Sequence, residues 1–337
     1  MAKSRESLLD LPTQAAVLRI AGACLEAAAS ALARLGIPGD PKDLHKFRVA
    51  VRRLRSLLRA YRPWLGGIAG RKVRRRLREL TRSTNVARDT DMQIDWLLER
   101  REKLERTERP GADWLLRQLR SRKRRGYRAA IAQLRQDFAD VAQLMKKRAA
   151  DSGSAEPRDF SSAFLEVLEP AVVRAREGLA AISGADDRKN VHRSRVQVKQ
   201  LRYLVEPLRK QSPEARAFAR QLKDLQRLLG DLHDVHLLEK EFASAVEDAA
   251  TEKARLLHRL AVEGDKTTLS NARRRDEGLG LVALAACARE SRDTLYAGLR
   301  RAWLPRRAVA LQVGFEALRE SFAPATTIAV DSAIHGS

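Results

Sequence analysis

Apolar residues recur every three or four positions over most of this chain, in segments rich in alanine, leucine, arginine, glutamate and glutamine. That spacing places the apolar side chains on one face of an α-helix, and these residue types favour helix. Nowhere do apolar and polar residues alternate convincingly, as they do in a half-buried strand. The pattern therefore predicts an all-α protein.

Clusters of glycine, proline and serine divide this helical pattern into segments. Helices are predicted over residues 12–35, 41–62, 68–106, 112–149, 159–183, 187–211, 213–262 and 277–304. The last thirty residues begin helix-like, from Ala308 to Phe322, and are expected to end as a loose tail.

A comparison of the chain with itself indicates a tandem repeat. The segment DLHKFRVAVRRLR at 43–55 recurs as NVHRSRVQVKQLR at 190–202, with histidine, arginine, valine and leucine at equivalent places. Seven further positions between Arg71 and Asp89 match positions 145 residues later. These matches predict two similar helical halves, residues 11–150 and 159–305, joined by a linker at 151–158 and followed by a partly helical or loose tail at 306–337.

Basic residues follow the same helical period and form four lanes. At about 100° per residue, His45 and the arginines after it fall within an arc of roughly 80°. The first lane comprises His45, Arg48, Arg52, Arg55 and Arg59, and the second comprises His192, Arg195, Lys199 and Arg202. The third lane comprises Arg71, Arg75, Arg78 and Arg82, and the fourth comprises Arg216, Arg220, Lys223 and Arg227. Glu206 stands in the second copy where the first has Arg59, so the second lane is shorter.

The charge balance indicates an anionic partner. Lysine and arginine number 66 against 43 acidic residues, a net charge of +23, and residues 42–82 hold 15 basic residues and 2 acidic ones. Like charges one helical turn apart destabilise a helix by a few tenths of a kcal/mol per pair, a cost that a bound anion offsets. A single arginine-rich helix is usually a solvated face, but four lanes repeated in register favour a binding site. Nucleic acid, an anionic membrane surface, polyphosphate and acidic proteins all fit this balance.

These motifs resemble the CHAD family, the conserved histidine α-helical domain. The resemblance rests on the two histidine-headed segments and on residues 87–91 (ARDTD) and 232–236 (LHDVH), and it covers about residues 11–305. It implies two four-helix halves related by a pseudo-twofold axis around a central basic channel that binds inorganic polyphosphate, and targeting to polyphosphate granules. By the same resemblance, the anion-binding residues are the first and second lanes without Arg59.

Other candidate chemistry is weaker. Asp231, His233, Asp234 and His236 form the single histidine–aspartate cluster, but the first half has Arg88 and Asp91 at the places of the histidines, which disfavours a metal site. Asp89 and Asp234 are instead expected to orient neighbouring basic side chains. The glycine-rich segment 66–72 lacks the Gly-Lys-Ser/Thr ending of a phosphate loop. We therefore expect a protein without cofactor, metal or catalytic activity.

Other features of the chain indicate a cytoplasmic protein. The first residues lack the apolar core of a signal peptide, and no run of about 18 apolar residues suggests a membrane span. Cys24 and Cys287 are expected to be small buried apolar residues, and all four tryptophans, Trp64 among them, are expected in the core.

Two other functions remain open. A nucleic-acid binder would share these electrostatics, although single-strand binders usually add aromatic platforms, and aromatic residues make up only 5% of this chain. A phosphate-handling enzyme would need acidic metal ligands and a base, which no motif supplies.

Overall fold

The computed structural model describes residues 7–35, 41–151, 158–304 and 308–322. In these residues the regular structure is helical apart from an isolated bridge between Pro12 and Asp159, which confirms the all-α prediction. The α-helices are α1 (Thr13–Ala33), α2 (Pro41–Ala60), α3 (Arg71–Ser83), α4 (Asn85–Arg101), α5 (Arg109–Asp151), α6 (Phe160–Ala180), α7 (Arg188–Val205), α8 (Pro213–Glu263), α9 (Lys266–Arg274), α10 (Glu277–Trp303) and α11 (Ala308–Phe322). Short 3₁₀ turns are η1 (Leu8–Asp10), η2 (Arg62–Trp64), η3 (Gly66–Ala69) and η4 (Glu206–Leu208).

The predicted helices differ from the observed ones in two places: one predicted helix is divided, and α9 was not predicted. The helix expected over 68–106 is divided at Thr84 into α3 and α4, where the buried Thr84 hydroxyl turns back to the carbonyls of Leu80 and Thr81. No glycine or proline marks that break. The segment after Gly264 forms α9, which begins where the Asp265 side chain accepts from the Thr268 amide. Most of the predicted linker and the end of the predicted tail lie outside the described residues.

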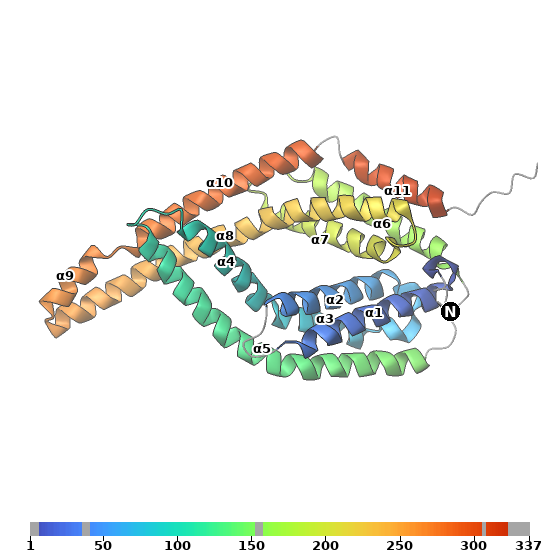
Figure 1. Ribbon diagram of the computed structural model, residues 1–337, viewed down its shortest axis with the longest axis horizontal. Coiled ribbons are helices and arrows are strands. Elements are labelled where there is room, and N and C mark those ends of the chain that lie inside the picture. Colours follow the sequence, from blue (N-terminus) through green and yellow to red (C-terminus); the bar gives the residue numbers. More distant parts are fainter. Residues whose placement is uncertain (1–6, 36–40, 152–157, 305–307, 323–337) are drawn as a thin grey trace, which may run out of the picture.

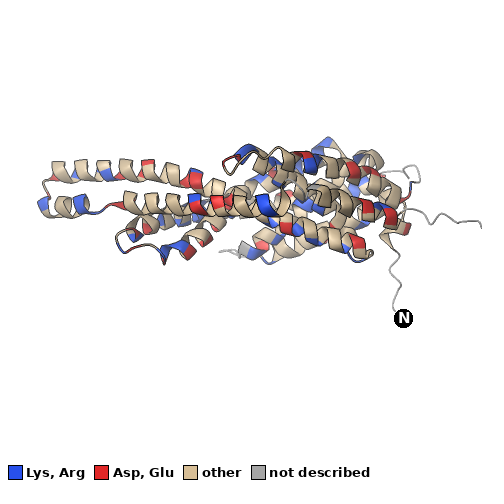
Figure 2. Ribbon diagram, turned by 90° about the horizontal axis from the view of Figure 1, so that it is seen from above, with Lys and Arg blue, Asp and Glu red and all other residues tan. Residues whose placement is uncertain are grey.

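Two apolar clusters hold together most of the helices that are labelled in Figure 1. The larger one joins α1, α2, α3, α6, α7 and α11 with parts of α5 and α8, and it forms the body of the molecule. The smaller one joins α4, the start of α5, the later part of α8 and α10. Beyond it, the end of α8, α9 and the start of α10 project as an arm, which Figure 2 shows from above. The two histidine-headed segments lie on α2 and α7, which contact each other in the body; the repeat and its pseudo-twofold axis stay predictions.

Helix α1 has the length and apolar composition of a membrane-spanning helix, a feature that the sequence analysis missed. In the described fold it packs against α2 and α6, and residues such as Ala16, Val17 and Leu32 are buried in the larger cluster. In the described fold α1 therefore packs as a helix of the body, with 33% of its most apolar window buried.

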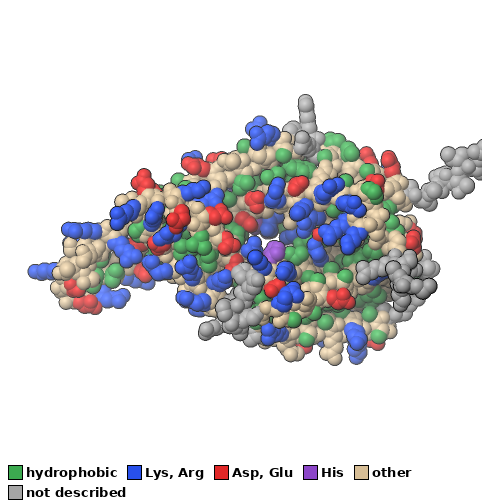
Figure 3. All heavy atoms as spheres, viewed as in Figure 1, with side chains coloured by type: hydrophobic (Ala, Val, Ile, Leu, Met, Phe, Trp, Pro, Cys, Tyr) green, Lys and Arg blue, Asp and Glu red, His purple; other side chains and the backbone are tan. Residues whose placement is uncertain are grey.

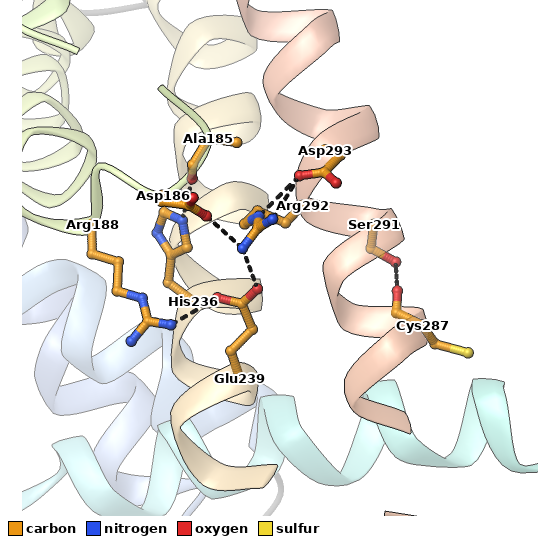
Figure 4. A network of polar contacts seen from close by, with 9 residues as sticks. All are labelled: Ala185, Asp186, Arg188, His236, Glu239, Cys287, Ser291, Arg292 and Asp293. Atoms are coloured by element: carbon orange, nitrogen blue, oxygen red, sulfur yellow. Dashed lines mark hydrogen bonds and ion pairs between the residues drawn. The ribbon is translucent and has the colours of Figure 1, made fainter. Parts of the chain in front are cut away.

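A polar network fixes the loop before α7 against α8 and α10 (Figure 4). Arg292 on α10 contacts Asp186 at 2.5 Å and Glu239 on α8 at 3.0 Å, and Arg188 reaches the same glutamate at 3.0 Å. His236 Nε2 lies 2.7 Å from the carbonyl oxygen of Ala185; because a carbonyl only accepts, this nitrogen carries the hydrogen. The network therefore sets where the start of α7, with His192, lies relative to α8.

Helices α5 and α10 cross at a close contact between two glycines. A Cβ atom added at Gly280 would lie 1.8 Å from the Glu108 carbonyl oxygen, and one added at Gly111 would lie 2.3 Å from the Glu277 carbonyl oxygen. Backbone atoms cannot move aside as a flexible side chain can. The crossing of the smaller cluster therefore requires glycine at both positions.

We predict that Gly280→Ala lowers the free energy of unfolding by about 2 kcal/mol or more, because the added methyl group forces the two backbones apart. Gly298→Ala is the matched control on the same helix, since nothing lies within 4 Å of its added Cβ. There alanine should stabilise by roughly 0.5–1 kcal/mol through helix propensity. Denaturant unfolding of both variants provides the measurement; equal effects would contradict the proposed crossing.

Candidate polyanion-binding site

A basic cavity of about 630 Å³ lies between α2, α3, α4, α7 and α8. In the space-filling view, lysine and arginine side chains gather along the hollow between the upper and lower helices, and a histidine is visible near its centre (Figure 3). In the view of Figure 1, the upper wall comes from α7 and α8 and the lower wall from α2, α3 and α4. The two histidine-headed segments thus face one shared space.

Ten of the seventeen predicted binding residues line this cavity: His45, Arg48, Arg52, Arg55, Arg59, Arg78, Arg82, His192, Arg195 and Lys199. Seven do not: Arg71, Arg75, Arg202, Arg216, Arg220, Lys223 and Arg227. Arg71 and Arg75 are exposed on the earlier turns of α3. The whole fourth lane is exposed on α8 and forms no part of the cavity wall, although the four lanes together were predicted to form the binding site.

Arg202 is turned toward Glu206 and the ring of Tyr203. Its guanidinium lies 4.0 Å from the carboxylate and 5.5 Å from the ring centroid. Glu206 also contacts Arg53 on α2 at 2.7 Å, so this carboxylate links the two halves. The ion pair with Arg53 explains why the second copy has Glu206 where the first copy has Arg59.

Arg48 serves the fold as well as the cavity wall. It is only 2% exposed, and its guanidinium donates to the Thr81 carbonyl at 3.2 Å, to the Thr84 hydroxyl and to the Asn85 side chain at 2.9 Å. These partners lie at the break between α3 and α4, so Arg48 ties that break to α2. Most of its donors are already engaged, which leaves less of this side chain for a ligand than its place in the first lane suggested.

Four titratable wall residues on α4 and α8 were not among the predicted binding residues, although Asp89 and Asp234 were expected to orient basic side chains. Arg88 and Asp89 lie on α4, and His233 and Asp234 occupy the matching positions on α8. The 145-residue offset of the repeat was the signal that could have identified them as a pair of equivalent sites. The His233 ring lies 4.7 Å from that of His192, and Asp234 lies 3.9 Å from Arg195, in agreement with an orienting role for this aspartate.

The cavity wall has far more cations than anions. Nine lysine and arginine side chains line it, against the two aspartates. Within the described residues, Arg195 alone of the nine is ion-paired with an acidic side chain, and Arg48 is hydrogen-bonded to neutral groups. The other seven have neither kind of partner there: Arg52, Arg55, Arg59, Arg78, Arg82, Arg88 and Lys199. Such a set repels itself, and the repulsion is weakly screened where the groups are partly buried.

This repulsion and the burial act together on the titratable groups. Burial, with Arg195 and Arg52 nearby, lowers the pKa of Lys199 to about 7. Burial also lowers the pKa of His233 to about 3, with help from Arg195 and His192. The pKa values of His45 and His192 are lowered by burial and by neighbouring arginines. At neutral pH the histidines are therefore largely neutral, and Lys199 is near its midpoint.

The described residues contain no group of three or more histidine, cysteine, aspartate or glutamate side chains placed to hold a metal ion. In the cluster noted in the sequence, His236 is buried and bonded to the Ala185 carbonyl, whereas His233 faces the cavity. Asp91, the last residue of the first-half motif, is buried and paired with Lys123 of α5 at 2.6 Å. His236 and Asp91 thus fix neighbouring segments of the fold rather than a metal ion.

Comparisons with known proteins agree with this architecture. The family model of the CHAD domain matches residues 19–243. The crystal structure of the CHAD domain from the plant Ricinus communis superposes with a TM-score of 0.59 and 21% identity, covering 94% of this chain and 96% of that one. PptA from Streptomyces chartreusis superposes with a TM-score of 0.57 and 15% identity, covering 92% and 99%. No curated protein matches the sequence. Because the family model matches more than half of the chain, the protein belongs to the CHAD domain family.

Proposed function

We propose that this protein binds inorganic polyphosphate in the basic cavity. The observation that carries the proposal is the set of seven cations with neither ion-pair nor hydrogen-bond partners among the described residues that face one partly enclosed space. A linear chain with about one negative charge per internal phosphate would neutralise them in series, and arginine forks bind phosphate oxygens in a bidentate manner. Membership of the CHAD family agrees with this ligand class.

The wall chemistry favours polyphosphate over nucleic acid. Tyr203 is the one aromatic side chain other than histidine among the described residues of the cavity wall, so the wall offers little surface for stacking successive bases. A duplex, whose major groove alone is about 12 Å wide, is too large for a space of this volume. Nucleic acid is therefore the secondary candidate.

The proposal extends to two further points. The protein is proposed to act by binding alone, and orthophosphate release from polyphosphate with Mg²⁺ or Mn²⁺ would contradict that part. It is also proposed to associate with polyphosphate granules in the cytoplasm, on the strength of the family resemblance. Fluorescence microscopy that finds the tagged protein away from stained granules would contradict this location.

Neutralising the unpaired cations should abolish most of the affinity. For Arg52, Arg55, Arg82 and Lys199, all changed to glutamine, we predict that the Kd for long polyphosphate rises on the order of a thousandfold, at about 1 kcal/mol for each lost charged contact. The dependence of log Kd on log salt should become shallower, because fewer counterions are released on binding. Titration of fluorescent polyphosphate at several salt concentrations measures both effects.

A matched control changes Lys146, Lys147, Arg255 and Arg259 to glutamine. All four side chains are exposed, lie outside the cavity and form no ion pair within the described residues, and the change in formal net charge is the same. The control should retain nearly all affinity. An equal loss in both variants would mean that binding depends on net charge alone and that the cavity is not the site.

Affinity should also depend on pH through Lys199. The pKa of this amine is about 7 in the free protein, and bound phosphate raises it by favouring the charged form. The complex therefore holds more protons than the free protein above pH 7, so affinity falls as pH rises, by about tenfold or more between pH 7 and 9. Long polyphosphate is the ligand for this measurement, because its terminal phosphates, which titrate near neutral pH, are a small part of its total charge.

Two variants isolate this effect. Lys199→Arg keeps its charge over the whole range and should flatten the pH profile. Lys223→Arg, an exposed position in the fourth lane, should keep the wild-type profile. Identical profiles for all three proteins would contradict the assignment to Lys199.

A further inference from the structure

A second pocket of about 440 Å³ adjoins the basic cavity. It lies between the end of α2, the turn η2, α6 and α7, and it shares Ser56, Arg59 and Gln200 with the wall of the basic cavity. The two spaces therefore meet along one boundary, with Arg59 at the junction. A ligand can occupy both at once.

The walls of this second pocket are largely apolar, unlike those of the cavity. They include Pro63, Trp64, Val167, Pro170 and Leu204. Trp64 was expected in the core, but it is only half-buried and borders this pocket. Its ring centroid lies 6.0 Å from that of Tyr61, and the guanidinium of Arg158 lies 5.9 Å from it. Inorganic phosphate gains nothing from such walls, because burying its charge beside apolar groups costs free energy.

Six polar or charged residues also line this pocket, among them Glu166, whose carboxylate is paired with Arg158 at 2.6 Å. Arg174 is exposed and forms no ion pair within the described residues. Gln197 lines the pocket, but its side-chain oxygen is buried against Gly178 of α6 and has no hydrogen-bond partner within the described residues; Gln200 lies at the boundary with the cavity. Amide side chains pair with the edges of nucleobases, and aromatic and arginine side chains stack on base faces. A mostly apolar pocket of this size with a few polar groups is typical of small organic ligands.

We propose that this second pocket binds the nucleoside of a nucleoside polyphosphate whose phosphate chain lies in the basic cavity. The proposal rests on the proposed function, since the cavity must accept phosphates. Trp64 supplies the stacking surface, Gln197 and Gln200 supply donors and acceptors, and Arg59 contacts the phosphate at the junction. Short polyphosphates that carry a nucleoside then bind better than bare ones.

The test compares adenosine 5′-tetraphosphate with inorganic tetraphosphate at fixed salt and pH. Both ligands contain four phosphorus atoms, but the nucleotide has one ionisable oxygen fewer, so electrostatics alone favours the inorganic chain. We expect the nucleotide to bind about tenfold more tightly, in the range that stacking one base on an aromatic side chain provides. Equal binding, or tighter binding of the inorganic chain, overturns the proposal.

Two variants locate the preference. Trp64→Ala should remove it while leaving the Kd for inorganic tetraphosphate within about twofold, which also shows that the fold is intact. Ala60→Phe fills the pocket from the end of α2 and should have the same effect. Trp96→Ala is the control: it removes a half-buried tryptophan that packs against Phe242, away from both spaces, and it should keep the full preference.

The outcomes separate this proposal from the proposed function. If Ala60→Phe keeps the nucleotide preference, the nucleoside binds elsewhere and the proposal fails, whatever Trp64→Ala does. If long polyphosphate binds the wild-type protein but the nucleotide shows no preference, the second pocket is wrong and the cavity stands. If long polyphosphate does not bind, the proposed function itself fails.

Discussion

Mutual repulsion among the cavity cations is the constraint on which the rest of this structure depends. Seven lysine and arginine side chains with neither ion-pair nor hydrogen-bond partners in the described part of the chain face one partly buried space, and the fold must hold them there without a ligand. The apolar cluster of the body supplies the main opposing free energy. Specific polar contacts add to it: Arg48 ties α2 to the break between α3 and α4, and Glu206 joins α7 to Arg53 on α2. A polyanion would relieve the repulsion, so binding and stability are coupled.

The two walls of the cavity respond differently to pH, although the sequence presents them as copies. Arg88 lies on α4, whereas the matching position on α8 holds His233, whose pKa is lowered to about 3 by burial and by neighbouring cations. Lys199 replaces an arginine of the first lane and has a pKa of about 7. The upper wall thus holds a lysine near its midpoint at neutral pH, and under the proposed function a bound phosphate favours its charged form.

Much of the fold could be predicted from the sequence because helical periodicity, proline and glycine are local signals. The break at Thr84 could not, since it is stabilised by Arg48 from another helix. The site was predicted in part for the same reason. Periodicity identified the lanes on α2 and α7, but which face of α8 meets the cavity depends on how the helices pack, so the fourth lane was wrongly placed along it. Arg88 and His233 lie outside any lane and were recognisable only through the repeat.

The central claim is that the cavity selects a linear polyphosphate rather than any polyanion. Competition for fluorescently labelled long polyphosphate, by unlabelled polyphosphate, single-stranded RNA and duplex DNA at one salt concentration and equal phosphate content, tests it most directly. We predict that polyphosphate competes at phosphate concentrations about a hundredfold below those needed for either nucleic acid, because the described cavity wall has many cations but, histidines aside, a single aromatic side chain for stacking bases, Tyr203. Displacement by RNA at the same phosphate concentration would contradict it.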